Sequence, residues 1–176
     1  MGKYFGTDGF RGEAGVTLNS EHAFRIGRFL GWYYGKETKK KVKAVVGKDT
    51  RRSSYTLEYA IAAGLTASGA DAYILHVTTT PSVSYATVGD DFDCGIMISA
   101  SHNPYTDNGI KLVNSLGEKM DDETLDKIEL YLDGKLDALG IDGSDIPYAT
   151  GADMGRIVDY AAGRNRYIGY LISLSK

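Results

Sequence analysis

Short apolar runs alternate with segments of helical periodicity along most of this chain, and no other feature of the sequence restricts its fold as strongly. The runs are rich in valine and isoleucine, are bounded by polar residues and glycine, and are too short for typical helices, which is the pattern of buried strands. They cover 42–47, 71–77, 93–99 and 109–113. Such alternation predicts an α/β domain in which helices cover both faces of a sheet.

Three longer segments repeat small or apolar residues at helical spacing. They predict helices that begin at Ser20, capped by Ser20 itself or by Asn19, at Ser53 or Ser54, and after an Asp121 cap. The first is expected to extend to about residue 34, the second to end near residue 69, and the third to include residue 132.

The relative direction of two of these strands can also be predicted. The residues between 93–99 and 109–113 are too few for a crossover helix, so these two strands are expected to be antiparallel. Pro81 is expected to begin a short helix as its first residue. The predicted fold is therefore a three-layer α/β/α domain with a mixed, mostly parallel sheet.

Periodicity fades from Gly140 to Gly155, where glycine and aspartate accumulate, as is typical of a domain edge. We predict one domain over 1–153, followed over 154–176 by a linker and a helix from Arg156 to about Leu174. An exposed apolar helix face favours association, so we expect this helix to contact a second molecule. The residues of that face are Ile157, Ala161, Ile168, Leu171 and Ile172.

Composition restricts the partners and the compartment. The 176 residues carry a net charge of −3, which favours neither nucleic acid nor an anionic membrane as partner. The sequence has no apolar run that could span a bilayer and no signal-peptide core at its start. Its single cysteine, Cys94, cannot form an internal disulfide, which fits the cytoplasm.

The segment from Ile98 to Lys111 is the most informative candidate site. It leaves a buried strand, turns at Asn103-Pro104 and again at Asp107-Asn108-Gly109, and thereby holds Ser101 at a strand end. Backbone N–H groups in such a loop can bind an anion, and a lysine on the returning strand can reach the same point. A nucleophile, a charge clamp and a proton carrier are the requirements of phosphoryl transfer.

Other interpretations of this segment remain open. Ser-His-Asn-Pro by itself is an ordinary turn. His102 suggests a Ser–His hydrolase, although neighbours in sequence rarely form that geometry and the G-x-S-x-G motif is missing.

Two further segments are rich in glycine and arginine. Residues 5–12 place three glycines around Arg11, whose guanidinium could grip a phosphate, and residues 47–53 run from a strand end into a helix start, where anions can bind. A glycine-rich turn and an ordinary capped helix start explain them equally simply. Neither matches the spacing of a P-loop or of a dinucleotide fingerprint.

Taken together, these segments resemble the α-D-phosphohexomutase superfamily. Residues 5–12 look like its N-terminal signature, 47–53 like its Gly-x-Asp-x-Arg turn, 99–104 like its phosphoserine loop and 108–111 like the segment that follows. Order and spacing agree over essentially the whole chain. Within the superfamily the match is closest to the phosphoglucosamine mutase branch, and the phosphomannomutase/phosphoglucomutase branch is the alternative.

The resemblance implies roles for five residues. Ser101 would carry the transferred phosphoryl group, and its phosphate would supply one ligand to Mg²⁺. Lys111 and His102 would lie near the reacting hydroxyl, with Lys111 the better general acid/base. Arg11 and Asn103 would bind phosphate. The implied reaction interconverts glucosamine 6-phosphate and glucosamine 1-phosphate through a bisphosphate, with a hexosamine 1,6-bisphosphate as activator.

The sequence departs from the family in what it does not contain. Family members have four domains, and the aspartate-rich metal loop, the sugar-specificity loop and the last phosphate loop belong to the other three. We therefore expect a fragment that is inactive alone. A non-catalytic phosphate-binding module remains an alternative, and a nucleotide-binding domain is disfavoured because neither glycine-rich nucleotide motif is present.

Overall fold

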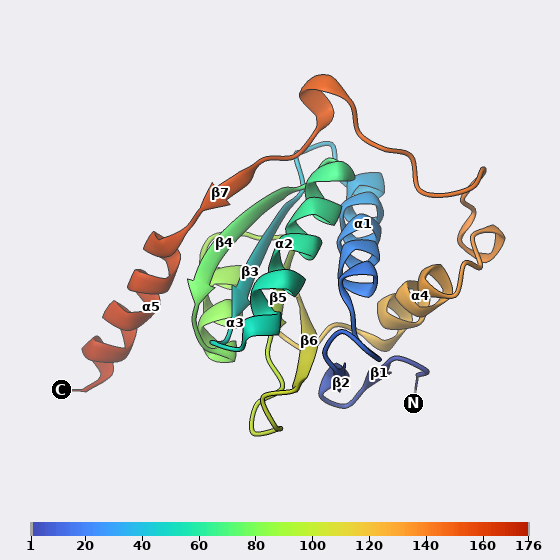
Figure 1. Cartoon of the computed structure of the whole chain (residues 1–176). Helices are drawn as coiled ribbons and strands as arrows, with labels where there is room; N and C mark the ends of the chain where they lie inside the picture. Colours follow the sequence, from blue (N-terminus) through green and yellow to red (C-terminus); the bar gives the residue numbers. More distant parts are fainter. Residues whose placement is uncertain (1, 176) are drawn as a thin grey trace.

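A computed structural model describes residues 2–175 and shows one seven-stranded sheet with helices on both faces (Figure 1). The strand order is β1-β2-β6-β5-β3-β4-β7. The four strands expected from the apolar runs are all present, and the expected α/β architecture is confirmed. The strands are β1 Phe5–Gly6, β2 Gly9–Glu13, β3 Lys43–Lys48, β4 Asp71–Val77, β5 Cys94–Ile98, β6 Asp107–Asn114 and β7 Ile157–Asp159.

Two of the five helices within residues 2–175, the first and the fourth, begin where a polar side chain caps them. Asn19 caps the first helix by accepting from the backbone N–H of His22 at 3.1 Å, and Asp121 caps the fourth by accepting from that of Thr124 at 2.8 Å. Pro81 is the second residue of its helix, not the first as expected. None of the described helices is long and apolar enough to cross a membrane. The helices are α1 Ser20–Glu37, α2 Arg52–Ala67, α3 Thr80–Gly89, α4 Asp122–Leu132 and α5 Ala161–Leu174, with short 3₁₀ turns at Asp137–Leu139 and Gly151–Asp153.

Two apolar clusters fix the layers. The larger one joins α1, α2 and α4 to one face of the sheet, and the smaller one joins α3 to the other face. The helices α1 and α2 approach so closely that a β-carbon on Gly64 would lie 2.1 Å from the carbonyl oxygen of Phe24. This contact fixes α2 against the core, and with it the end of the helix that faces the site.

The sheet has a parallel half and an antiparallel half. Parallel pairing joins β5, β3, β4 and β7, while β1, β2, β6 and β5 pair antiparallel. The expected antiparallel pair is confirmed, with Cys94 opposite Asn114 and Ile98 opposite Ile110. Parallel pairs are therefore half of the total, not most of it, because the unexpected hairpin of β1 and β2 adds two antiparallel pairings.

The C-terminal helix is shorter than expected. It begins at Ala161, and residues 157–159 form the edge strand β7 beside β4. The carboxylate of Asp71 accepts the backbone N–H of Arg156 at 2.7 Å, and Ala72 donates to the carbonyl of Arg156 at 2.8 Å. Residues 157–159 thus pair with the open edge of the sheet as a strand. Ile157 therefore does not belong to the helix face.

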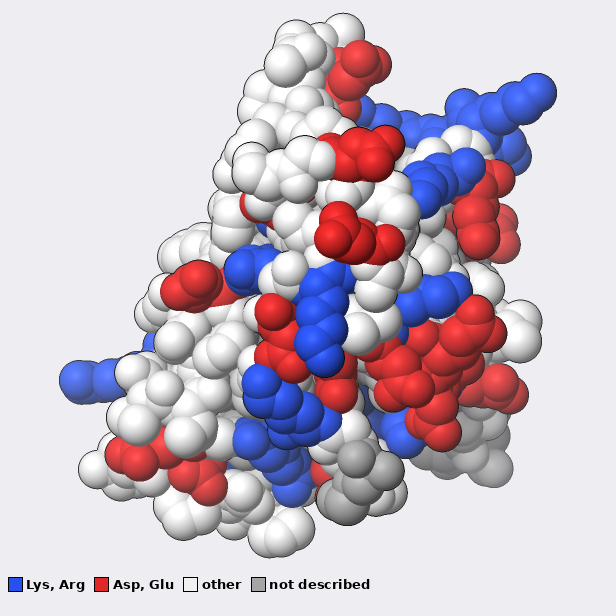
Figure 2. Space-filling model, turned by 90° about the vertical axis from the view of Figure 1, so that its right-hand side faces the viewer, with Lys and Arg blue, Asp and Glu red and all other residues white. Residues whose placement is uncertain are grey.

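The helix α5 extends away from the sheet in Figure 1 and is held against α3 and the residue that follows α3. Arg166 contacts the carboxylate of Asp90 at 2.5 Å, and the ring of Tyr85 stacks on that of Tyr170 at 4.9 Å. Several large apolar side chains remain exposed on α5, namely Ile168, Leu171, Ile172 and Leu174. On the face shown in Figure 2, acidic and basic side chains are interspersed and form no continuous basic surface.

Candidate functional site

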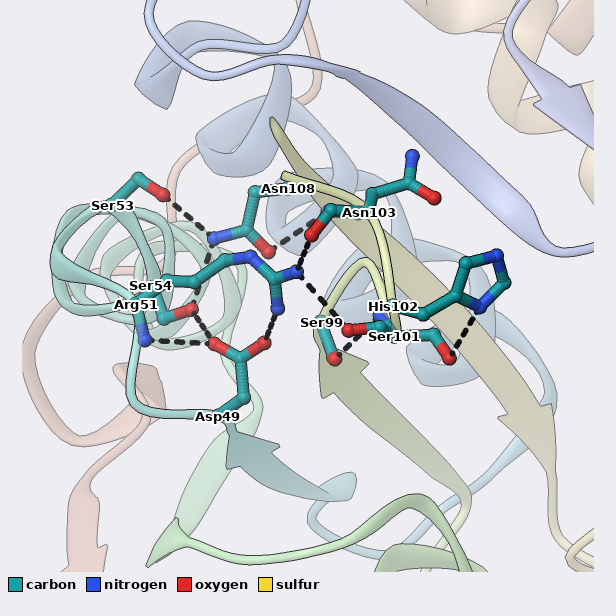
Figure 3. Close-up of polar contacts among 10 residues, drawn as sticks. Asp49, Arg51, Ser53, Ser54, Ser99, Ser101, His102, Asn103 and Asn108 are labelled. Atoms are coloured by element: carbon teal, nitrogen blue, oxygen red, sulfur yellow. Dashed lines mark hydrogen bonds and ion pairs between the residues drawn. The ribbon is translucent and has the colours of Figure 1, made fainter. Parts of the chain in front are cut away.

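The candidate site lies at the carboxyl ends of the parallel strands β3 and β5. The strand β5 leads into residues 99–106, here called the Ser101 loop, and β3 leads into the start of α2. These two connections touch, because the backbone N–H of Asp49 donates to the carbonyl of Ile98 at 2.9 Å. Two of the three segments that the sequence singled out therefore meet at one edge of the sheet (Figure 3).

Asp49 organises the first connection. Its carboxylate accepts the hydroxyl of Ser54 at 2.6 Å and the backbone N–H of Arg51 at 3.0 Å, and it also pairs with the Arg51 guanidinium. Burial alone would raise the pKa of Asp49, but these hydrogen bonds outweigh burial and hold that pKa below its usual value. The carboxylate is therefore charged at neutral pH and fixes the guanidinium beside it.

Arg51 joins this connection to the Ser101 loop. Its Nη2 donates to the carbonyl oxygen of Asn103 at 2.8 Å and to that of Ser101 at 3.2 Å. Only 11% of the Arg51 side chain is exposed. In Figure 3 the guanidinium lies between the Asp49 carboxylate and the loop backbone. The start of α2 and the Ser101 loop are thus connected by one largely buried cation.

Asn108 anchors the returning limb of the loop. Its side-chain amide is buried and donates to the hydroxyls of Ser53 at 2.8 Å and Ser54 at 2.9 Å. Its side-chain oxygen accepts the backbone N–H of Gly109 at 2.8 Å. The first turn of α2 therefore holds the loop from two directions, through Arg51 and through Asn108.

Ser101 is exposed at the turn of the loop. Its φ of 54° lies in the left-handed region, which residues with a β-carbon rarely adopt. Its backbone N–H donates to the hydroxyl of Ser99 at 3.1 Å, and its own hydroxyl lies 3.4 Å from Nδ1 of His102. An exposed hydroxyl on a tightly held turn, next to an imidazole, is suited to nucleophilic attack and proton transfer.

Arg11 and Lys111 flank the loop from the sheet. Arg11 on β2 lies opposite Gly109 on β6, and Lys111 is two residues further along β6, so the two side chains share one face of the sheet. A β-carbon on Gly109 would lie 2.6 Å from the carbonyl of Ser99 and 3.1 Å from Cγ of Arg11. The arginine stem and the base of the Ser101 loop therefore meet above this glycine. The Arg11 Nε is buried without a hydrogen-bond partner.

Of the five residues selected from the sequence, Ser101, His102 and Asn103 thus lie in the Ser101 loop, while Lys111 lies on β6 and Arg11 on the neighbouring strand β2. Asn103 uses its side-chain amide to close the loop, by donating to Asp107 at 3.1 Å. Sequence reasoning gave no role to Asp49, Arg51 or Asn108, although it singled out both segments that contain them. The sequence did contain a signal for the contact between Asp49 and Arg51. An aspartate two residues before an arginine at a strand-to-helix junction favours a local turn with an ion pair.

The space beside the site is open. A pocket of about 650 Å³ lies between the start of α2 and the loop, lined by residues 14, 50–53 and 105–106. Its volume is in the range of small-molecule sites. Among residues 2–175, no group of three or more His, Cys, Asp or Glu side chains is arranged to hold a metal ion.

Comparisons with known proteins identify the family to which this chain is similar. The family model described as "Phosphoglucomutase/phosphomannomutase, alpha/beta/alpha domain I" matches residues 2–136. Two curated relatives are named phosphoglucosamine mutase. The one from Lachnospira eligens is 66% identical over 99% of this chain, and the one from Lachnoclostridium phytofermentans is 62% identical over 99%. The chain spans only 38% and 37% of their respective lengths.

A solved structure shows the same fold at lower identity. A phosphoglucomutase/phosphomannomutase family protein from Burkholderia thailandensis superposes with a TM-score of 0.73 and is 24% identical. The match covers 97% of this chain and 35% of that one.

Proposed function

Because the chain belongs to the phosphoglucomutase/phosphomannomutase family and contains its α/β/α domain I, we propose that it is the phosphoserine domain of a phosphosugar mutase. Ser101 is the phosphorylated residue. The observation that carries this proposal is the loop itself, in which an exposed hydroxyl at a left-handed φ of 54° is held at the carboxyl edge of the sheet. Glucosamine 6-phosphate and glucosamine 1-phosphate are the proposed substrates, supported by the names of the relatives that are 66% and 62% identical.

The proposed chemistry moves one phosphoryl group at a time. A sugar hydroxyl oxygen forms a bond to phosphorus, the bond between phosphorus and the Ser101 Oγ breaks, and the hydroxyl proton passes to a base. Lys111 is the preferred proton carrier, and His102, whose Nδ1 lies 3.4 Å from that Oγ, is the second. The bisphosphate then reorients and returns its other phosphate to Ser101.

Positive charge at the loop would bind the phosphate. The stem of Arg11 lies beside the base of the loop, and its guanidinium is proposed to bind phosphate oxygens. Asn103 is proposed to bind phosphate through the side-chain N–H that its bond to Asp107 leaves over, since its backbone N–H already donates to the carbonyl of Ala100. The pocket of about 650 Å³ adjoins the loop only through residues 105–106, so the sugar phosphate is proposed to approach Ser101 from its exposed side.

Mg²⁺ fits this site only in part. The phosphate of Ser101 would supply one hard oxygen ligand, and a bound Mg²⁺ would neutralise charge on the transferred group. Because residues 2–175 form no carboxylate cluster for a metal, we propose that the other ligands come from outside this chain. We likewise propose that residues 1–153 form the first domain, that 154–176 lead towards a second, and that the chain alone is inactive.

Phosphate labelling tests the proposal. In a hybrid enzyme, this chain replaces the aligned N-terminal part of the Lachnospira eligens relative. The hybrid is treated with labelled glucosamine 1,6-bisphosphate, and its phosphopeptides are mapped. Label is expected on Ser101, is expected to disappear in Ser101→Ala, and is expected to persist in the control Ser115→Ala, which changes an exposed serine outside the loop. Label on another serine, or label that survives Ser101→Ala, would refute the assignment.

A further inference from the structure

We infer that Arg51 is the positioning residue of the Ser101 loop, and that it acts by holding backbone carbonyls rather than by binding phosphate. The inference rests on the proposed role of Ser101. Arg51 touches neither the Ser101 hydroxyl nor the side chains proposed to carry the proton, yet its Nη2 contacts the carbonyls of Ser101 and Asn103.

The contacts explain how an unfavourable turn is held. A residue with a β-carbon enters the left-handed region only when its surroundings compensate for the strain. The Arg51 Nη2 binds the carbonyl of Ser101 itself at 3.2 Å and that of Asn103, two residues later, at 2.8 Å. One donor group on both carbonyls fixes the direction of the peptide groups after Ser101, and so the backbone position from which its side chain projects.

The guanidinium is itself held on the rigid part of the fold. Its Nη1 pairs with Asp49, and Asp49 is fixed by the hydroxyl of Ser54 at 2.6 Å on the first turn of α2. The planar fork of arginine can bind a carboxylate on one side and carbonyls on the other at the same time, which the single ammonium of a lysine cannot reproduce.

The same contacts make Arg51 a poor phosphate ligand. Both terminal nitrogens already have partners, and the adjacent Asp49 carboxylate compensates the positive charge. Arg52, the next residue, is exposed and provides a matched control, because it carries the same charge at the same helix start without joining this network.

Hydrogen exchange of the 176-residue chain tests the positioning directly, without requiring catalysis. In Arg51→Lys, the amides of Asn103 and Asp107, which bond to Ala100 and Pro104, are expected to exchange about tenfold faster or more, the effect of losing one charge-assisted hydrogen bond. Amides of β3 and β5 should be unchanged, as should every amide in Arg52→Lys. Asp49→Asn should likewise speed the exchange of the Asn103 and Asp107 amides. Unchanged loop exchange in both Arg51→Lys and Asp49→Asn would overturn the inference.

Kinetics of the hybrid enzyme separate positioning from phosphate binding. Arg51→Lys is expected to lower kcat about tenfold or more while KM stays within a factor of about three, because misorientation affects the reacting geometry rather than uniform binding. A raised KM with unchanged kcat would mean that Arg51 binds substrate phosphate, and would overturn the inference. If the unaltered hybrid fails to label Ser101, the proposed function fails instead, and the exchange result still decides whether Arg51 holds the loop.

Discussion

Ser101 combines an exposed hydroxyl with a backbone φ of 54°, and this pairing has a measurable thermodynamic consequence. A β-carbon in the left-handed region costs about 1–2 kcal/mol, whereas glycine adopts it freely. Replacing Ser101 by glycine removes the strain but adds freedom to the unfolded chain, worth about 0.4–1 kcal/mol. Ser101→Gly is therefore expected to be more stable than Ser101→Ala by about 1 kcal/mol in urea unfolding.

Ser115 supplies the control for this comparison. It is an exposed serine in the turn after β6 and is not among the residues with positive φ, so there the alanine variant should be the more stable one. If Ser101→Ala equals or exceeds Ser101→Gly in stability, the strain at Ser101 is not part of the folded state. Neither Ser101 variant should accept phosphate in the hybrid enzyme.

Lys111 is expected to contribute to rate more than to stability. It is half-buried on β6, on the same face of the sheet as Arg11. Lys111→Met in the hybrid enzyme should lower kcat by about 10²–10⁴, the range for loss of a general acid or base. Lys119→Met, the same change at an exposed lysine, is the matched control. A kcat close to that of the unaltered enzyme would remove Lys111 from the mechanism, and a large fall in melting temperature would indicate a structural role.

Asp49 should make the chain sensitive to acid. Burial opposes its ionisation, but hydrogen bonds from Ser54 and Arg51 hold its pKa below the usual value of 3.8. A carboxyl with a lowered folded-state pKa stabilises the fold fully above its unfolded pKa and loses that contribution as the pH falls through the folded pKa. Urea unfolding should show Asp49→Asn clearly less stable at pH 7, with the gap to wild type closing below about pH 4. A gap that stays constant between pH 7 and pH 3 would contradict this.

Residue roles could be predicted only where they are local in sequence. Ser101, His102 and Asn103 belong to one short motif, so the sequence alone indicated them. The link from Arg51 to the carbonyls of Ser101 and Asn103 spans 50 and 52 residues and depends on how β3 and β5 align. Likewise, no propensity predicts a left-handed serine, because the contacts that hold it come from another element.

At the scale of elements, the crossing of α1 and α2 depends on the absence of side chains. A β-carbon on Gly64 would lie 2.1 Å from the carbonyl of Phe24 and 2.8 Å from the backbone nitrogen of Arg28, neither of which is a flexible side-chain end. Gly64→Ala is therefore expected to destabilise the fold by about 1–3 kcal/mol, as overpacking does, although alanine favours helices.

Gly169 on α5 provides the opposite case. Nothing lies within 4 Å of the position that a β-carbon would occupy there, so Gly169→Ala should stabilise the chain by up to about 1 kcal/mol through helix propensity. Thermal and urea unfolding of both variants measure the difference. If Gly64→Ala is as stable as Gly169→Ala, the two helices do not pack as closely as described.

Elements with strong internal patterns were predictable, and short edge strands were not. The buried strands and the capped helices follow from periodicity and from Asn19 and Asp121. By contrast, β1 has two residues and depends on a distant partner, since the Glu129 carboxylate on α4 accepts the backbone N–H groups of Lys3, Tyr4 and Phe5, each at 2.8 Å. The strand β7 depends in the same way on Asp71. Such strands exist because a tertiary contact completes them.

At the scale of the whole molecule, the two halves of the sheet position different residues of the candidate site. The parallel half, through β3 and β5, ends at the Ser101 loop and the Asp49–Arg51 pair, whereas the antiparallel half, through β2 and β6, brings Arg11 and Lys111 to the same edge. The antiparallel return of β6 makes this convergence possible, because a crossover helix would carry Lys111 away from the loop. The site therefore depends on the mixed topology that the short connection after β5 imposes.

The helix α5 carries the last prediction, which concerns association of the chain with itself. Ile168, Leu171 and Ile172 are 48%, 47% and 65% exposed, and an apolar patch of this kind favours contact with another surface. We expect the 176-residue chain to self-associate, and Leu171→Glu combined with Ile172→Glu to abolish association without lowering the melting temperature, because neither residue belongs to the Tyr85–Tyr170 stack that holds α5. Light scattering across a concentration series measures this. Val16→Glu, which changes an exposed apolar residue far from α5 in sequence, should leave association intact. If the unaltered chain and the double variant scatter equally as monomers, the apolar face of α5 is not a contact between copies, and its exposure needs another explanation.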